Sequence, residues 1–141
     1  MSKRDEIISE AMTWFRTPWH HCARIKGVGV DCAQFLIGVY VGVGLIPEPN
    51  IAPYPRDWHL HKEEPRFLNQ LLKYADKVEV PQAGDIIMFK YARHAAHGGI
   101  MLDETKVIHA WLDEKMVTIT DLTVSPIAGR VAGFYKLKGL E

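Results

Sequence analysis

Apolar residues recur at helical spacing near the start of the chain, in residues 3–16. Five of them share one face: Ile7, Ile8, Ala11, Met12 and Phe15. This spacing predicts an amphipathic helix. Ser2 and Asp5, which stand three residues apart, resemble a capping box at its start. We expect the helix to end at Thr17-Pro18, because the residue before a proline disfavours the helical region.

A second helix is predicted to begin at Cys32, because residues 33–43 are almost wholly apolar. Asp31 stands where an N-cap residue is expected, and Gly44 stands where a helix C-terminus favours glycine. A helix that is apolar on every side belongs inside a domain, and this one is too short to span a bilayer.

A third helix is predicted at 65–75, after a loop at 45–64 that contains four prolines. Aromatic residues and histidines lie between these prolines, and a long ordered loop of this kind often shapes a binding site. Pro65 is a suitable first residue for the helix.

From residue 84 the pattern changes to short β-prone segments separated by turns. Five strands are predicted: 86–89, 99–102, 107–112, 116–120 and 131–137. Sequential short strands with tight connections indicate an antiparallel meander. The predicted fold class is therefore α+β, with N-terminal helices packed on a C-terminal antiparallel five-stranded sheet. The length of 141 residues favours a single domain spanning 1–141.

The charges are balanced, with 17 Lys and Arg against 17 Asp and Glu, and there is no polybasic run. This argues against nucleic acid as a partner. No apolar run reaches membrane length, so no membrane partner is expected. The first residues are not followed by the apolar stretch of a secretory signal, so we expect synthesis in the cytoplasm without such a signal. Two cysteines cannot form a disulfide framework, and a thiol kept free suits a reducing compartment.

Cys32 is the candidate nucleophile, because it falls in the first turn of the second predicted helix. The unpaired N–H groups there and the positive end of the helix dipole stabilise a thiolate. A free cysteine has a pKa of about 8.5, and helix N-termini can lower it. The alternative is a small buried apolar side chain, which is the usual role of a free cysteine.

A thiolate that attacks an amide needs a base, and the base needs an orienting partner. His97 stands at the entry to the predicted strand at 99–102, and His109 lies inside the next one. Pairing through the turn between these strands would bring both histidines near each other on the sheet. The pair Gly98-Gly99 leaves room for another element to approach closely. His94 is the alternative base, and His109 on its own could be a core histidine bonded to backbone.

His20, His21 and Cys22 form a cluster that suggests a metal site. Adjacent residues rarely bind one ion well, and the sequence offers no second CxxC or HxxxH pair to complete a ligand set. We therefore expect no metal at this loop and a structural role for Cys22.

Several short segments follow one another in an order typical of a known family. They are Thr17-Pro18, Val30-Asp31-Cys32, residues 81–89, His97-Gly98-Gly99-Ile100 and Val107-Ile108-His109-Ala110. Together they cover nearly the whole chain, which resembles the NlpC-type cysteine peptidases of bacterial cell-wall metabolism. That family has a papain-like fold. The loop at 24–32 is most similar to the phage-tail branch of the family.

This resemblance implies roles for particular residues. Cys32 would attack an amide carbonyl, His97 would be its base, and His109 would orient His97. Asp31 and Trp19 are the candidates for contact with the substrate or the oxyanion. Many members have Tyr at the position of Trp19, and many have Ser-Gly where this chain has Ala33-Gln34.

The implied function is that of a cysteine endopeptidase acting on peptidoglycan stem peptides, at D-γ-glutamyl–diamino acid bonds and without a cofactor. With no export signal, a phage tail or a prophage-encoded particle would carry the protein to the wall, with tail proteins as partners. Two alternatives stay open. One is a non-catalytic tail-assembly or wall-binding module of the same fold. The other is a cysteine acyltransferase or amidase acting on a non-wall substrate.

Overall fold

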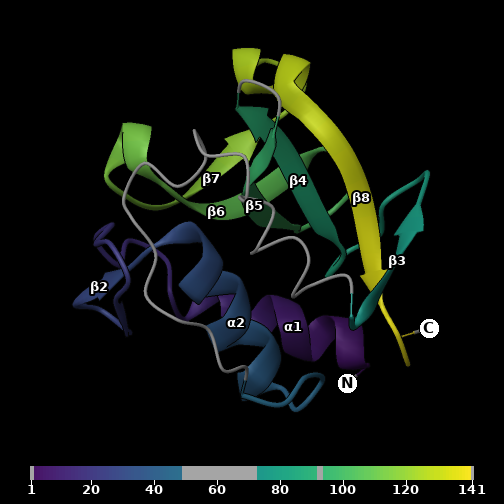
Figure 1. Ribbon diagram of the computed structural model, residues 1–141, viewed down its shortest axis with the longest axis horizontal. Coiled ribbons are helices and arrows are strands. Elements are labelled where there is room, and N and C mark those ends of the chain that lie inside the picture. The colour runs from purple at the N-terminus through teal and green to yellow at the C-terminus, as the bar shows by residue number, and fades with distance from the viewer. Residues whose placement is uncertain (1, 49–72, 92–93, 141) are drawn as a thin grey trace.

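The computed structural model describes residues 2–48, 73–91 and 94–140, and Figure 1 shows two helices packed beneath an antiparallel sheet. The helices are α1 (Lys3–Met12) and α2 (Cys32–Gly42). A short antiparallel hairpin of β1 (Arg24–Ile25) and β2 (Gly29–Val30) precedes α2. No helix within the described ranges is long and apolar enough to cross a membrane.

The sheet has six strands in the order β3-β8-β4-β5-β6-β7, and all neighbours are antiparallel. They are β3 (Ala75–Val78), β4 (Ile86–Tyr91), β5 (His94–Met101), β6 (Lys106–Trp111), β7 (Met116–Asp121) and β8 (Val131–Leu137). Two 3₁₀ segments, η2 (Leu112–Glu114) and η3 (Pro126–Arg130), lie on either side of β7 along the chain.

The α+β prediction is confirmed, but the predicted number of five strands is wrong. The additional strand, β3, lies at the sheet edge and includes Ala75, which was predicted as the end of a helix. Most of that helix and most of the 45–64 loop lie outside the described residues. The strand was missed because it is short and polar, with only one buried position.

The predicted meander holds from β4 to β7, but the chain then returns and β8 pairs with the free edge of β4. The cause is visible in β4, where four consecutive side chains from Ile86 to Phe89 are fully buried. A strand that is apolar on both faces belongs in the middle of a sheet, and therefore needs a partner on each edge.

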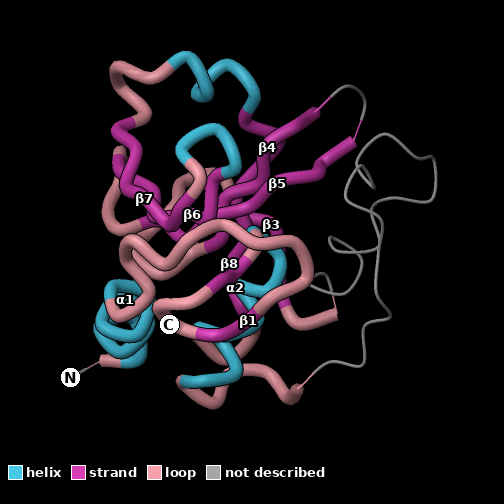
Figure 2. Tube along the Cα trace, turned by 90° about the vertical axis from the view of Figure 1, so that its left-hand side faces the viewer, coloured by secondary structure: helices cyan, strands magenta, loops and turns pink. Residues whose placement is uncertain are grey.

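The sheet separates two clusters of apolar side chains, and Figure 2 shows the strands and helices that contribute them from the side. On the face toward the helices, residues of α1 and α2 pack on alternate positions of β4 to β6. The opposite face carries a smaller cluster: Ile87, Phe89, Met101, Val107 and Ile127. The second cluster continues the surface on which His97 and His109 lie, because alternate residues of a strand share a face.

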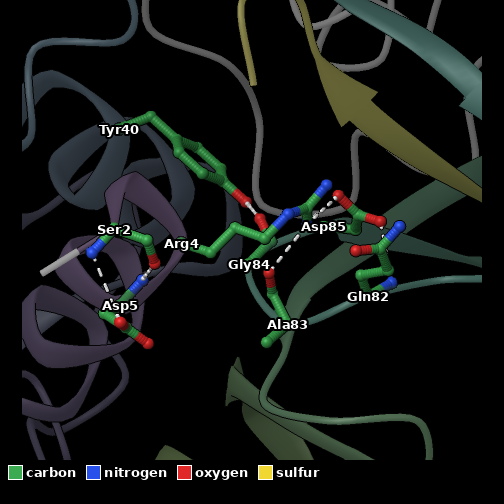
Figure 3. Close-up of polar contacts among 8 residues, drawn as sticks. All are labelled: Ser2, Arg4, Asp5, Tyr40, Gln82, Ala83, Gly84 and Asp85. Atoms are coloured by element: carbon green, nitrogen blue, oxygen red, sulfur yellow. Dashed lines mark hydrogen bonds and ion pairs between the residues drawn. The ribbon is translucent and has the colours of Figure 1, made fainter. Parts of the chain in front are cut away.

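Polar contacts fix both helices to the segment that leads into β4 (Figure 3). Arg4 of α1 donates from Nη1 to the carbonyl of Ala83 at 2.8 Å and to Oδ1 of Asp85 at 2.9 Å. Tyr40 of α2 donates its hydroxyl proton to the carbonyl of Gly84 at 2.8 Å. The carboxylate of Asp85 is nearly inaccessible, so the ion pair with Arg4 is held away from water. These contacts fix the position of α2 relative to the central strand.

The predicted N-terminal caps of both helices are confirmed, but the prediction that the first helix extends to residue 16 is wrong. Ser2 and Asp5 form a capping box at the start of α1, which stops at Met12, and residues 13–16 form turns. Arg16 has a positive φ of 69° and donates its backbone N–H to the carbonyl of Val117, which draws the chain out of the helix toward β7.

Candidate active site

Cys32 occupies the position predicted for it, as the first residue of α2. Asp31 is the N-cap, and its Oδ1 accepts the backbone N–H of Gln34 at 2.9 Å. The Cys32 side chain is buried. The first turn of a helix presents N–H groups without intrahelical partners, so the thiol lies at the positive end of α2.

His97 and His109 meet directly, as the pairing of the predicted strands required. Nε2 of His97 lies 2.7 Å from Nδ1 of His109, and both imidazoles are buried. Nε2 of His109 lies 2.8 Å from the hydroxyl oxygen of Thr120 on β7. A line of hydrogen bonds therefore crosses three neighbouring strands, from β5 through β6 to β7.

Aromatic rings hold the two imidazoles in place. His97 stacks on Phe89 of β4 at a centroid distance of 5.5 Å, and His109 stacks on Trp111 at 5.1 Å. Packed rings and hydrogen bonds together restrict both side chains to one orientation, which is what a general base and its orienting partner require.

The line of hydrogen bonds has two possible proton arrangements. In the first, His97 donates from Nε2 to His109, and His109 donates from Nε2 to the oxygen of Thr120. In the second, Thr120 donates its hydroxyl proton to His109, and His109 donates from Nδ1 to His97. Only the first leaves Nδ1 of His97 as the basic nitrogen of that ring, so a base at Nδ1 requires Thr120 to act as acceptor.

Two glycines bring the helix and the histidines to β5, as predicted for the pair Gly98-Gly99. A Cβ at Gly98 would lie 3.0 Å from Cδ1 of Leu36, which is four residues after Cys32 on α2. A Cβ at Gly99 would lie 2.9 Å from Cβ of His109 and 2.5 Å from a Val107 methyl. Gly98 therefore lets α2 approach the sheet, and Gly99 leaves space for His109.

Burial dominates the electrostatics of Cys32. Desolvation, with a further contribution from the Asp31 carboxylate, raises the pKa of the Cys32 thiol to about 12. The backbone N–H groups of Gly98, Ala33 and Cys32 itself lower this pKa, but their effect is smaller. The prediction of a lowered thiol pKa is therefore wrong for this conformation, because the charge of the helix terminus does not compensate for the loss of water.

The backbone groups that affect the pKa of Cys32 also show which strand its thiol lies against. The backbone N–H of Gly98 is close enough to lower the pKa of Cys32, and Gly98 directly follows His97. The structure thus brings the thiol to the strand that carries the first histidine. His97 and His109 are joined by a hydrogen bond, and the backbone N–H of Gly98, the residue after His97, acts on the Cys32 thiol.

Both histidines are kept neutral. Burial, followed by the neighbouring His109, holds the pKa of His97 well below its ordinary value. Burial lowers the pKa of His109 to about 3. A neutral His109 can accept a hydrogen bond from His97 and orient it without adding a positive charge beside it.

Asp31 and Trp19, the candidates for substrate or oxyanion contact, make other contacts here. Asp31 accepts the N–H of Gln34 at one oxygen and the N–H of Cys22 at the other, at 2.8 Å. Trp19 is half-buried and stacks on His21 at 6.4 Å. The side chain of His94, the alternative base, lies outside the described residues.

Thr120 is the residue that sequence reasoning missed. It lies in a predicted strand and is buried, although its neighbours Thr118 and Ile119 are more exposed. A buried polar residue opposite a candidate histidine is the signal that could have found it, since buried hydroxyls take hydrogen-bond partners.

Comparison with known proteins supports the fold. Among solved structures, a Staphylococcus aureus protein described as similar to a lipoprotein of the NLP/P60 family is 18% identical, with a TM-score of 0.67. The match covers 96% of this chain and 41% of that protein, so this chain spans less than half of its relative. The NlpC/p60 domain of the peptidoglycan hydrolase SagA is 19% identical, with a TM-score of 0.63, and 94% of this chain covers 96% of that domain.

A third similar structure is the peptidoglycan hydrolase RipB from Mycobacterium tuberculosis. It is 16% identical, with a TM-score of 0.64, and the match covers 99% of this chain and 65% of that protein. At these identities the structures show a shared fold. No curated protein sequence matches this chain.

The family assignment comes from the sequence itself. The model of the NlpC/P60 family matches residues 16–135, which include the first residue of α2 and both strands that carry the paired histidines. That family is a hydrolase family with cysteine peptidase members. A match over this length, on a chain that also has the papain-like α+β fold of its structural neighbours, shows that the chain belongs to the NlpC/P60 family.

Proposed function

We propose that this chain is a cysteine endopeptidase that hydrolyses amide bonds in peptidoglycan stem peptides. The observation that carries the proposal is the 2.7 Å contact between two buried imidazoles, His97 on β5 and His109 on β6. The first turn of α2, which carries Cys32, lies against β5 at Gly98. The family match and the two peptidoglycan hydrolases among the similar structures support the same conclusion.

The reaction is an acyl transfer in which Cys32 is the nucleophile. Its sulfur attacks the amide carbonyl while Nδ1 of His97 takes the thiol proton. The tetrahedral intermediate then breaks its C–N bond, and His97 returns the proton to the leaving amine. Water attacks the resulting thioester, its proton again passes through His97, and the acid product and the free thiol are released. His109 holds His97 by the Nε2–Nδ1 hydrogen bond during both steps.

Burial favours a neutral thiol and a neutral imidazole in the described conformation. A pKa of about 12 for Cys32 and a lowered pKa for His97 both oppose a preformed thiolate–imidazolium pair. Proton transfer from the thiol to Nδ1 of His97 therefore accompanies attack on the carbonyl.

Backbone N–H groups supply the oxyanion site in this proposal. The N–H of Cys32 is at the positive end of α2, where a developing negative charge is stabilised. Trp19 has an indole N–H and no ionisable hydroxyl, so it can assist only as a hydrogen-bond donor.

The finer assignment follows from the resemblance of the motifs. We assign the scissile bond to the D-γ-glutamyl–diamino acid type. The likeness of the loop at 24–32 to the phage-tail branch supports a phage tail or a prophage-encoded particle as the location, with tail proteins as partners.

Incubation with purified muropeptides tests the proposal. Wild-type protein should release free peptides whose masses identify the cleaved bond, and Cys32→Ala and His97→Ala should release none. His20→Ala is the control and should behave as wild type, because His20 is exposed and is not part of the trio of Cys32, His97 and His109. Acceptor-bound products without free peptides would instead indicate an acyltransferase.

A non-catalytic wall-binding or tail-assembly module is the second candidate, and one observation favours it. Cys32 is buried and its pKa is raised, which is typical of an inert structural cysteine. Binding of muropeptides by the wild type, with identical binding by Cys32→Ala and no cleavage by either, would establish this alternative.

A further inference from the structure

A second group of potential ligands lies beside the nucleophile helix, in the turn before β1. We propose that His21, Cys22 and Asp31 bind a zinc ion or a similar borderline divalent cation. Their ligand atoms, an imidazole nitrogen, the thiol sulfur and a carboxylate oxygen, all lie within 4.8 Å of one another. This site does not depend on the peptidase proposal, because it uses none of the trio.

The spacing of the ligands is close to what zinc requires. Zinc binds nitrogen and oxygen at about 2.0–2.1 Å and sulfur at about 2.3 Å, so two ligands of a tetrahedral site lie roughly 3.5 Å apart. Nε2 of His21 is 3.4 Å from Sγ of Cys22, which already matches this separation. The carboxylate of Asp31 lies within 4.8 Å of both other ligand atoms, so movement toward them completes three protein ligands, and water can take the fourth position.

His21 and Cys22 are adjacent in sequence, and adjacent residues rarely bind one ion well. The backbone conformation of this turn lets both side chains reach a common point. Cys22 has a φ of 60°, a left-handed conformation that is uncommon outside glycine. Its backbone N–H donates to Oδ2 of Asp31 at 2.8 Å, which holds the turn against the start of α2. The third ligand therefore comes from a residue nine positions later, and no second CxxC or HxxxH pair is needed.

Neighbouring contacts orient two of the three ligands. The ring of Trp19 stacks on His21 with an interplanar angle of 29°, and Oδ1 of Asp31 is fixed by the N–H of Gln34. Cys22 is exposed, so an ion can enter from solvent without opening the fold.

The donor set also selects the class of metal. Sulfur and imidazole nitrogen favour zinc and related transition metals, whereas magnesium and calcium prefer oxygen ligands throughout. Cobalt(II) is therefore a suitable spectroscopic probe, since a cobalt–thiolate bond gives a charge-transfer band in the near ultraviolet.

Titration of the metal-free 141-residue chain with zinc and with cobalt tests the proposal. We expect one ion per chain, a cobalt–thiolate band, and affinity reduced more than about tenfold in His21→Ala and Cys22→Ala. Asp31→Asn should weaken binding while keeping a side-chain oxygen for the helix cap, so a folding defect can be separated from loss of a ligand. His20→Ala is the matched control from the same turn, and Cys32→Ala keeps all three ligands. Both should bind as wild type.

Three results would overturn the site. The first is no measurable zinc binding by the wild type. The second is equal affinity in wild type and Cys22→Ala. The third is a cobalt–thiolate band that disappears in Cys32→Ala and persists in Cys22→Ala.

Discussion

The buried imidazole of His109 should make the fold sensitive to acid. Burial lowers the pKa of His109 to about 3, whereas a histidine in an unfolded chain titrates near about 6.5. Between these values the unfolded state binds more protons than the folded state. The free energy of unfolding should therefore be highest above about pH 6.5 and fall as the pH drops toward 3, with no further loss from this group below that.

The size of the effect follows from the same two values. Each pH unit inside the window changes the free energy of unfolding by about 1.4 kcal/mol per titrating group. Going from pH 7 to pH 5 should therefore cost about 2 kcal/mol through His109. His97 acts in the same direction, because its pKa is also lowered.

Urea denaturation of wild type and His109→Gln at both pH values measures this loss. Glutamine can keep hydrogen bonds to His97 and Thr120 but does not titrate, so its loss of stability on acidification should be smaller by about 2 kcal/mol. Other titratable groups are present in both proteins, so their contributions cancel when the two losses of unfolding free energy are compared. An identical loss in wild type and variant would refute a buried, neutral His109.

Three further predictions concern packing, proton arrangement and thiol reactivity. Gly99→Ala should lower the free energy of unfolding by about 1–3 kcal/mol in urea denaturation, because the added Cβ would lie 2.5 Å from the Val107 side chain of β6. Gly129→Ala is the control, because a Cβ added there meets open space. Thr120→Val should reduce kcat about tenfold or more, because valine leaves Nε2 of His109 without its hydrogen-bond partner at 2.8 Å. Thr120→Ser keeps the hydroxyl and should be close to wild type. Equal kcat in the two variants would contradict the arrangement in which the Thr120 oxygen accepts a proton from His109. Iodoacetamide at neutral pH should alkylate Cys22 much faster than Cys32, as peptide mapping would show. Cys22 is exposed, whereas burial raises the pKa of Cys32 to about 12 and keeps its side chain a thiol below that pH. Faster labelling of Cys32 would indicate a more open resting state.

Features set by neighbouring residues were predictable from the sequence. The capping box at Ser2, the N-cap at Asp31 and the strand at 131–137 depend on local spacing, and all three are confirmed. The pairing of His97 with His109 could also be predicted, since only a short turn separates their strands.

Features set by contacts distant in sequence were not predictable in the same way. The position of β8 beside β4 depends on which edge of the sheet stays open, and the polar strand β3 lacks a hydrophobic pattern. The pKa of the Cys32 thiol likewise depends on contacts that are distant in sequence. The place of Cys32 on a helix is local, but its pKa depends on how completely the sheet excludes water from it.

The proposed peptidase activity requires Cys32, His97 and His109 to act together on a peptide bond, and digestion of intact sacculi measures this most directly. Wild-type protein should release soluble peptides whose masses correspond to cleavage within the stem, and Cys32→Ala should release none at the same concentration. Equal release by wild type and Cys32→Ala, or intact sacculi in both reactions, would contradict the account.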